Sequence, residues 1–162
     1  MRIMKMIKKL VTGILLFTFI IIGFLDFLLQ GEMTYSSIMA KDINRVYFYT
    51  FFLMTIGCWL LYNKWFTGIG FILVATFNSY FVEYVIIHNY LASVAIYIGI
   101  VIDIIVRHKY KWLIPLIIIG IVQGIAFTAI VAWLGSSAYY IVGCMEFLAL
   151  CIGSVFVIKK IE

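Results

Sequence analysis

Apolar residues form long runs separated by short polar segments along the 162-residue chain. Each run is close to the roughly 20 residues that a helix needs to cross the hydrocarbon core of a bilayer. The pattern predicts an all-α fold, a six-transmembrane-helix bundle that occupies residues 1–162 as a single domain. The expected helices are 10–29, 46–62, 66–87, 88–106, 113–134 and 139–158.

No polar loop marks the boundary between the third and fourth helices. One continuous helix over 66–106 would overshoot the hydrocarbon layer, which is about 30 Å thick. His88-Asn89 is the only polar pair suited to a turn there, and asparagine favours helix starts. We therefore expect the chain to reverse at this pair. The polar segment 30–45 is expected to be either a plain loop or a short helix on the membrane surface.

Basic residues before the first apolar run resemble the start of a secretory signal. The run from Leu10 to Leu29 is longer than a typical signal core, and no small-x-small cleavage site follows it. We expect a retained first helix and no cleaved signal peptide.

The distribution of basic residues predicts the orientation. Six helices place both termini on one side, and ten of the 12 lysines and arginines then fall on that side. Basic residues are enriched in cytoplasmic segments, so both termini are expected in the cytoplasm of a cell-membrane protein, in a plasma or bacterial inner membrane. The ten are Arg2, Lys5, Lys8, Lys9, Lys64, Arg107, Lys109, Lys111, Lys159 and Lys160; the other two are Lys41 and Arg45.

Composition excludes an ordinary soluble domain. The chain is 66% hydrophobic and only 12% charged, against about 45–50% and about 25% in soluble domains. The formal charge of +5 lies between apolar runs, which favours anionic headgroups over nucleic acid as the partner. The expected partners are the lipid bilayer and its cytoplasmic headgroups, with a membrane-protein partner or a homo-oligomer left open.

Ionisable residues inside the predicted spans are few, and each costs about 2.5–3.5 kcal/mol to insert. Topology places Asp26, Glu83, His88 and Glu146 toward the outer end of the bundle. They form a polar hub or ligand site in this interpretation. Its candidate residues are Glu83, His88, Asn89, Glu146, Asp26 and Asn78.

Small residues predict which helix faces point inward. His88, Gly99 and Asp103 fall within about 80° of arc on one helix, together with Ala92 and Ala95. Small residues let helices approach closely, so this face should lie in the bundle. Other such stripes are Gly120-Gly124-Thr128 and Gly143-Glu146-Ala149-Gly153. The hub is therefore expected to face a cavity open to the outside.

At the inner end, Asp103 and Arg107 are four residues apart on one helix. That spacing predicts an ion pair at the cytoplasmic interface.

Three kinds of chemistry fit the hub. It could be a satisfied hydrogen-bond network, a proton relay or ligand site, or a divalent-metal site built from a histidine and carboxylates. The sequence has no P-loop, nucleophile elbow or glycine-rich cofactor fingerprint. No cofactor and no catalytic residue are predicted, and the metal question stays open.

The segment from Phe81 to Ala92, with His88 and Asn89, resembles the signature of damage-regulated autophagy modulators and their fungal and bacterial six-helix relatives. The resemblance implies a six-helix membrane fold and a role in membrane trafficking, lysosome biology or lipid handling. The resemblance implies that His88 and Asn89 match the signature positions of that family, and it implies no catalytic role for them. The glycine and proline often found before that histidine in bacterial relatives are absent.

The leading functional expectation is a non-enzymatic integral membrane protein, such as a sensor, scaffold or assembly partner. One alternative is a small transporter or ligand-binding bundle with an outward-facing cavity. A further alternative is a metal-dependent membrane hydrolase using Glu83, His88 and Asp26. A bacteriocin-immunity role is also compatible with a small, basic, membrane-embedded chain.

Overall fold

The computed structural model describes residues 2–30, 41–78, 80, 93–132 and 135–160, and these form α-helices and one 3₁₀ turn with no strand among them. An all-helical fold is thus confirmed for the described residues. The elements are α1 Arg2–Gln30, α3 Ile43–Tyr62, α4 Thr67–Thr76, α6 Ser93–Val106, η3 Tyr110–Trp112, α7 Leu113–Ala132 and α8 Gly135–Lys160.

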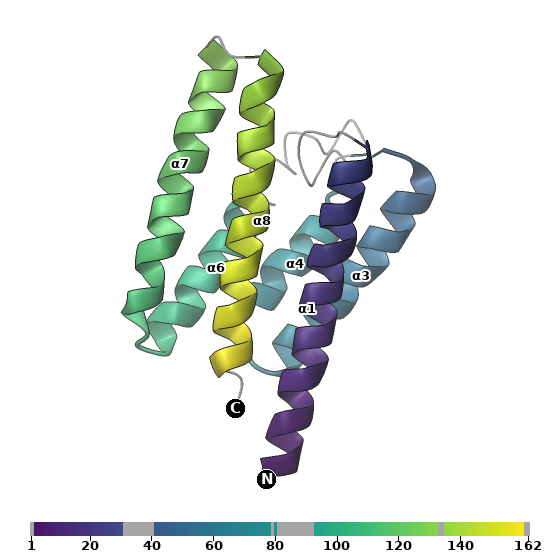
Figure 1. Cartoon of the computed structure of the whole chain (residues 1–162). Helices are drawn as coiled ribbons and strands as arrows, with labels where there is room; N and C mark the ends of the chain where they lie inside the picture. Colours follow the sequence, from purple (N-terminus) through teal and green to yellow (C-terminus); the bar gives the residue numbers. More distant parts are fainter. Residues whose placement is uncertain (1, 31–40, 79, 81–92, 133–134, 161–162) are drawn as a thin grey trace.

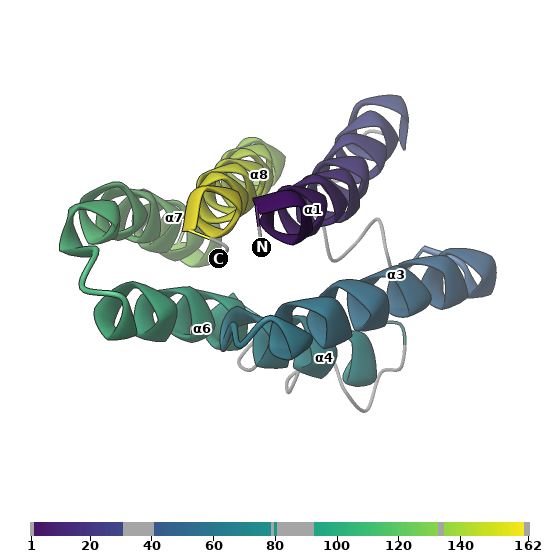
Figure 2. The same ribbon diagram turned by 90° about the horizontal axis from the view of Figure 1, so that it is seen from below.

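The helices lie in two layers. Figure 2 shows α7, α8 and α1 in one row and α6, α4 and α3 in the other. Both ends of the chain lie at the same end of the bundle (Figure 1). The turn between α3 and α4 and the loop between α6 and α7 lie at that end too.

Aromatic side chains pack the two layers together. Phe19 of α1 makes edge contacts with Tyr49, Phe52 and Phe71, at centroid distances of 6.2, 5.8 and 6.3 Å. These rings connect α1 to α3 and α4 in the opposite layer.

Three helices, α1, α3 and α8, begin earlier than the apolar runs predict. α1 starts at Arg2, so the basic residues Arg2, Lys5, Lys8 and Lys9 form the first turns of the helix and do not precede it. α3 starts at Ile43 because the carboxylate of Asp42 accepts a hydrogen bond from the backbone N–H of Arg45 at 3.0 Å, as an N-cap.

The helix expected over 66–87 is wrong in its length, because α4 ends at Thr76. Asn78 supplies the physical reason: its side-chain oxygen accepts the backbone N–H of Tyr80 at 2.9 Å. Such a local turn competes with helical hydrogen bonding. The expected reversal at His88-Asn89 lies outside the described residues, as do residues 31–40 of the polar segment.

The helix expected over 139–158 also begins earlier than predicted. Gly135 begins α8, and Ser136 and Ser137 lie in its first turn. Glycine and serine are tolerated there because the first N–H groups of a helix have no partner within it.

Glycines set the closest helix approaches. A Cβ on Gly68 of α4 would lie 2.5 Å from the carbonyl oxygen of Gly57 of α3. A Cβ on Gly99 of α6 would lie 2.8 Å from Thr67 Cα. The prediction that Gly120 faces a neighbouring helix is wrong. Gly120 is exposed, and no atom lies within 4 Å of a Cβ placed there.

Large apolar side chains cover the outside of the bundle. They include Leu10, Ile14, Ile21 and Leu25 on α1 and Ile114, Ile117, Ile118 and Ile121 on α7. Counted over the described residues, α1 (Arg2–Leu29) and α3 (Ile43–Tyr62) are long and apolar enough to cross a membrane by length and composition.

Candidate functional site

The most constrained polar group of the described chain is the carboxylate of Asp103, on α6. Its side chain is fully buried. Oδ2 accepts the backbone N–H of Thr67 at 2.8 Å and the Thr67 hydroxyl at 2.6 Å. Oδ1 accepts the backbone N–H of Phe66 at 3.0 Å. Asp103 is therefore bonded to the first turn of α4.

These bonds replace a missing helix cap. Phe66, the N-cap residue of α4, makes no side-chain capping bond. The first N–H groups of a helix lack partners and carry partial positive charge, so an anion stabilises them. Asp103 performs this function from another helix. The close approach at Gly99, one turn earlier on α6, brings the two backbones near enough for it.

Arg107 completes the charge balance. Its Nη1 lies 3.3 Å from Asp103 Oδ1, so the ion pair expected from the four-residue spacing is present. Its Nη2 donates to the backbone carbonyl of Lys64 at 3.1 Å. The guanidinium carbon lies 3.8 Å from the ring centroid of Trp65. Arg107 thus ties α6 to the turn between α3 and α4.

A row of rings extends from this turn to α8. Trp65 contacts Phe156 edge-on at 5.6 Å, and Phe156 contacts Trp112 at 5.5 Å. The Lys159 amine lies 5.8 Å from the Trp112 ring centroid. The row joins three segments that are distant in sequence at one end of the bundle.

A second polar group links α1 and α3 at the opposite end. The Tyr49 hydroxyl donates to Asp26 Oδ2 at 2.7 Å. Arg45 Nη1 lies 3.1 Å from the same oxygen, a charge contact whose N–H is not aligned for a hydrogen bond. Arg45 Nε lies 3.1 Å from Asp42 Oδ2. Asp26 therefore bridges two helices through a tyrosine and an arginine.

The same two helices are also joined near the basic end. The Trp59 indole N–H donates to Thr12 Oγ1 at 2.8 Å, and the Thr12 hydroxyl donates to the Lys8 carbonyl at 2.7 Å. Thr12 is fully buried.

The remaining hub residues are placed only in part. Asn78 is buried in the segment that follows α4. Glu146 is half-buried on α8 and interacts electrostatically with Tyr97 of α6. Glu83, His88 and Asn89 lie outside the described residues. Within the described part of the chain, no three histidine, cysteine or acidic residues gather in a metal-like group.

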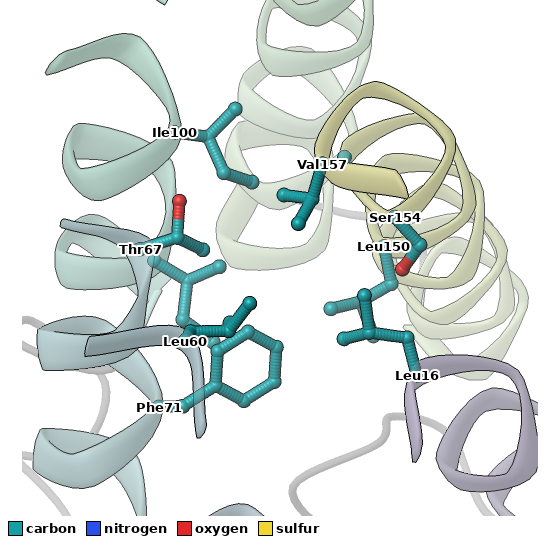
Figure 3. A pocket seen from close by; sticks show the side chains of 10 residues that line it. Leu16, Leu60, Thr67, Phe71, Ile100, Leu150, Ser154 and Val157 are labelled. Carbon is teal, nitrogen blue, oxygen red and sulfur yellow. The ribbon is translucent and has the colours of Figure 1, made fainter. Parts of the chain in front are cut away.

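A small cavity lies between the two layers. Figure 3 shows Leu60, Thr67 and Ile100 on one side and Leu16, Leu150 and Val157 on the other. Its volume of about 10 Å³ is close to the room needed for one water molecule. The lining is apolar apart from Thr67 and Ser154.

Sequence reasoning missed the partners of these polar groups. Thr67, Tyr49, Thr12 and Trp59 were not singled out, although each bonds across helices. One signal was available: Thr67 begins a helix directly after two aromatic residues that cannot cap it. If the helix has no capping side chain of its own, another segment must supply the acceptor for its first N–H groups.

Comparison of the chain with protein-family models, curated proteins and solved structures gives no match. The resemblance to damage-regulated autophagy modulators is therefore a prediction from the expected six-helix layout and from the segment Phe81 to Ala92, which lies outside the described residues.

Proposed function

We propose that the chain is a six-span integral membrane protein with both termini in the cytoplasm, and that it acts without catalysis as a scaffold or assembly partner. Membership in the six-helix relatives of the damage-regulated autophagy modulators belongs to the same proposal and depends on His88 and Asn89.

The distribution of charge carries this proposal. Ten of the 12 basic residues lie at helix ends or turns that share one end of the bundle. Contacts between segments support that grouping: Arg107 bonds the Lys64 carbonyl, Lys159 lies over Trp112, and Trp59 bonds Thr12 in the first half of α1. Asp42 and Arg45 lie at the other end, with Asp26. A one-sided basic excess is the general mark of the cytoplasmic face.

The outer surface supports membrane insertion. The exposed apolar side chains of α1 and α7 would be costly in water and are suited to lipid. α7 has 20 residues and α8 has 26, which is sufficient for a layer about 30 Å thick.

The polar contacts support a scaffold. Asp103, Asp26 and Thr12 are each bonded to a neighbouring helix. Polar groups used in this way fix the packing of a membrane bundle, where apolar side chains alone give little preference between helices and lipid.

Cysteine labelling in intact cells tests the topology. Single-cysteine variants Lys5→Cys, Lys41→Cys and Lys111→Cys are made after Cys58, Cys144 and Cys151 are replaced by serine. A membrane-impermeant maleimide should label only position 41 before permeabilisation, and all three positions after it. Labelling of positions 41 and 111 from the same side would contradict the six-span arrangement. Recovery of the chain in the soluble fraction would contradict membrane insertion itself.

A further inference from the structure

α3 ends in a turn that places a lysine in an unusual backbone conformation. Lys64 N–H donates to the Leu61 carbonyl at 2.8 Å, and Trp65 N–H donates to the Leu60 carbonyl at 2.9 Å. These are the two bonds of a Schellman motif. Lys64 is the left-handed residue of the motif, with φ of 61°.

α6 ends in the same way. His108 N–H donates to the Ile105 carbonyl at 2.9 Å, and Lys109 N–H donates to the Ile104 carbonyl at 3.0 Å. His108 is the left-handed residue here, with φ of 52°. Among the described residues, Lys64 and His108 are the non-glycine residues with positive φ.

Glycine is the usual residue at this position of a Schellman motif, because any Cβ there is strained. The chain instead has a lysine in one turn and a histidine followed by Lys109 in the other. Lys64 and His108 therefore occupy positions where the backbone conformation favours glycine. The cost of placing a side chain there points to a role for the side chains themselves.

The two turns are held together from within. Arg107 bonds the Lys64 carbonyl at 3.1 Å and covers Trp65. Trp65 and Trp112 both pack on Phe156, so η3 and the end of α8 are joined to the same two turns. We call this set of contacts the frame; it consists of Arg107, Trp65, Trp112 and Phe156. The frame fixes the relative positions of three segments that carry basic side chains.

The frame carries excess positive charge. Lys64, Arg107, Lys109, Lys111 and Lys159 contribute five charges, and Asp103 removes one, which leaves +4. Asp103 is fully buried and already bonded to Thr67, Phe66 and Arg107. Lys64, Lys111 and Lys159 are exposed.

We propose that these two turns and the end of α8 form a binding surface for the phosphate headgroup of an anionic phospholipid. The inference rests on the proposed function, in which this end of the bundle meets the cytoplasmic leaflet. Lysines bind phosphate as mobile point charges, and Lys64, Lys111 and Lys159 are exposed at this surface. The largely buried row of rings holds the segments that carry these lysines, so the charge is presented in one place to an anionic headgroup.

Competitive tryptophan quenching with brominated lipids tests the proposal. The protein is reconstituted in phosphatidylcholine vesicles with a minor fraction of phosphatidylglycerol, and the relative association of the two lipids is measured. A basic residue near an anionic surface contributes about fivefold in binding. The wild-type chain should prefer phosphatidylglycerol by about tenfold or more on that basis.

Two triple variants form the matched comparison. K64Q/K109Q/K111Q removes three charges from the proposed surface, and K5Q/K8Q/K9Q removes three from the α1 terminus at the same end of the bundle. The first should reduce the lipid preference nearly to equality. The second should retain most of it. Equal losses in both variants would show that only total charge matters, and would overturn the proposed surface.

Lys64→Gly separates lipid binding from folding. Glycine relieves the left-handed strain, so thermal stability in pure phosphatidylcholine should be unchanged or higher, while the preference for phosphatidylglycerol falls. An unchanged preference in this variant and in the K64Q/K109Q/K111Q variant would refute the proposal. The thermal unfolding midpoint is also compared with added inorganic phosphate and with phosphatidylglycerol. An equal rise of the midpoint with both would refute a lipid headgroup as the bound phosphate.

The outcomes that refute the headgroup surface can be told apart from those that refute the proposed function. If the chain does not insert into phosphatidylcholine vesicles at all, the membrane assignment fails together with the headgroup surface. If it inserts with the expected topology but shows no preference for phosphatidylglycerol, the headgroup surface alone is refuted.

Discussion

Asp103 and Thr67 form the cap of a helix to which only one of them belongs. The carboxylate of Asp103 on α6 accepts both the backbone N–H and the hydroxyl of Thr67, at 2.8 and 2.6 Å, at the start of α4. A cap supplied from a neighbouring helix exists only once the helices have docked. The first turn of α4 and the packing of α6 should therefore form together.

Asp103→Ala is expected to destabilise the protein strongly. It removes the acceptor of the Phe66 and Thr67 backbone N–H groups and of the Thr67 hydroxyl, and it leaves Arg107 Nη1 without its ion-pair partner. Loss of one partner from a buried charged network costs about 3–5 kcal/mol. The free energy of unfolding, measured by denaturant titration in detergent micelles, should fall by about that amount.

Two milder variants calibrate this result. Asp103→Asn keeps one acceptor oxygen and should cost less than Asp103→Ala. Thr67→Val removes only the hydroxyl bond to the carboxylate and should cost about 1.5–3 kcal/mol, the usual range for a hydrogen bond to a charged group. If Asp103→Ala were no worse than Thr67→Val, the cap would be unimportant to folding.

Gly99→Ala should be destabilising because the new methyl group would meet backbone. Its Cβ would lie 2.8 Å from Thr67 Cα and 3.1 Å from Thr67 N, so α6 and α4 would have to separate. Overpacking of this kind typically costs about 1–3 kcal/mol.

Gly120→Ala is the matched control, since no atom lies within 4 Å of a Cβ at that position on α7. Alanine is the better helix former, by up to about 1 kcal/mol. Thermal unfolding should therefore show a lower midpoint for Gly99→Ala and an unchanged or higher midpoint for Gly120→Ala. A similar response of both variants would argue against a tight crossing at Gly99.

Apolar run length predicted some of the helix boundaries correctly, because those runs end where polar residues begin. The ends of α3 at Tyr62 and of α6 at Val106, and the start of α7 at Leu113, agree with the predicted boundaries. Boundaries set by side-chain bonds were missed. Asp42 starts α3 early and Asn78 stops α4 early, and neither effect changes the hydropathy of the run.

The polar contacts were harder to predict because they join distant segments. Asp103 was assigned its partner four residues away, since helical spacing alone reveals that pair. Its bonds to Thr67 span 36 residues, and the Trp59–Thr12 bond spans 47. A sequence pattern gives the depth of a residue in the bundle but not which helices are neighbours, so cross-helix partners require the packed structure.

The Trp59–Thr12 bond should show as a coupling between α1 and α3. Thr12→Val and Trp59→Phe each remove one side of the 2.8 Å hydrogen bond, and the double variant removes both. Hydrogen bonds between membrane helices contribute about 0.6 kcal/mol on average. A double-mutant cycle on the free energy of unfolding should give a coupling of at least about that size, because Thr12 is fully buried. Additive effects would mean that the bond contributes nothing to helix association.

At the other end of the same helix pair, Tyr49→Phe should weaken the packing of α3 on α1. The variant keeps the aromatic ring in the core and removes only the hydroxyl that donates to Asp26 at 2.7 Å. A hydrogen bond to a charged group contributes about 1.5–3 kcal/mol, so the free energy of unfolding should fall by an amount in that range. Tyr47→Phe is the control: it makes the same chemical change two residues away, on a side chain that is 68% exposed, and should have little effect. Equal stability of the two variants would show that Arg45 alone satisfies Asp26, and that the tyrosine bond is dispensable.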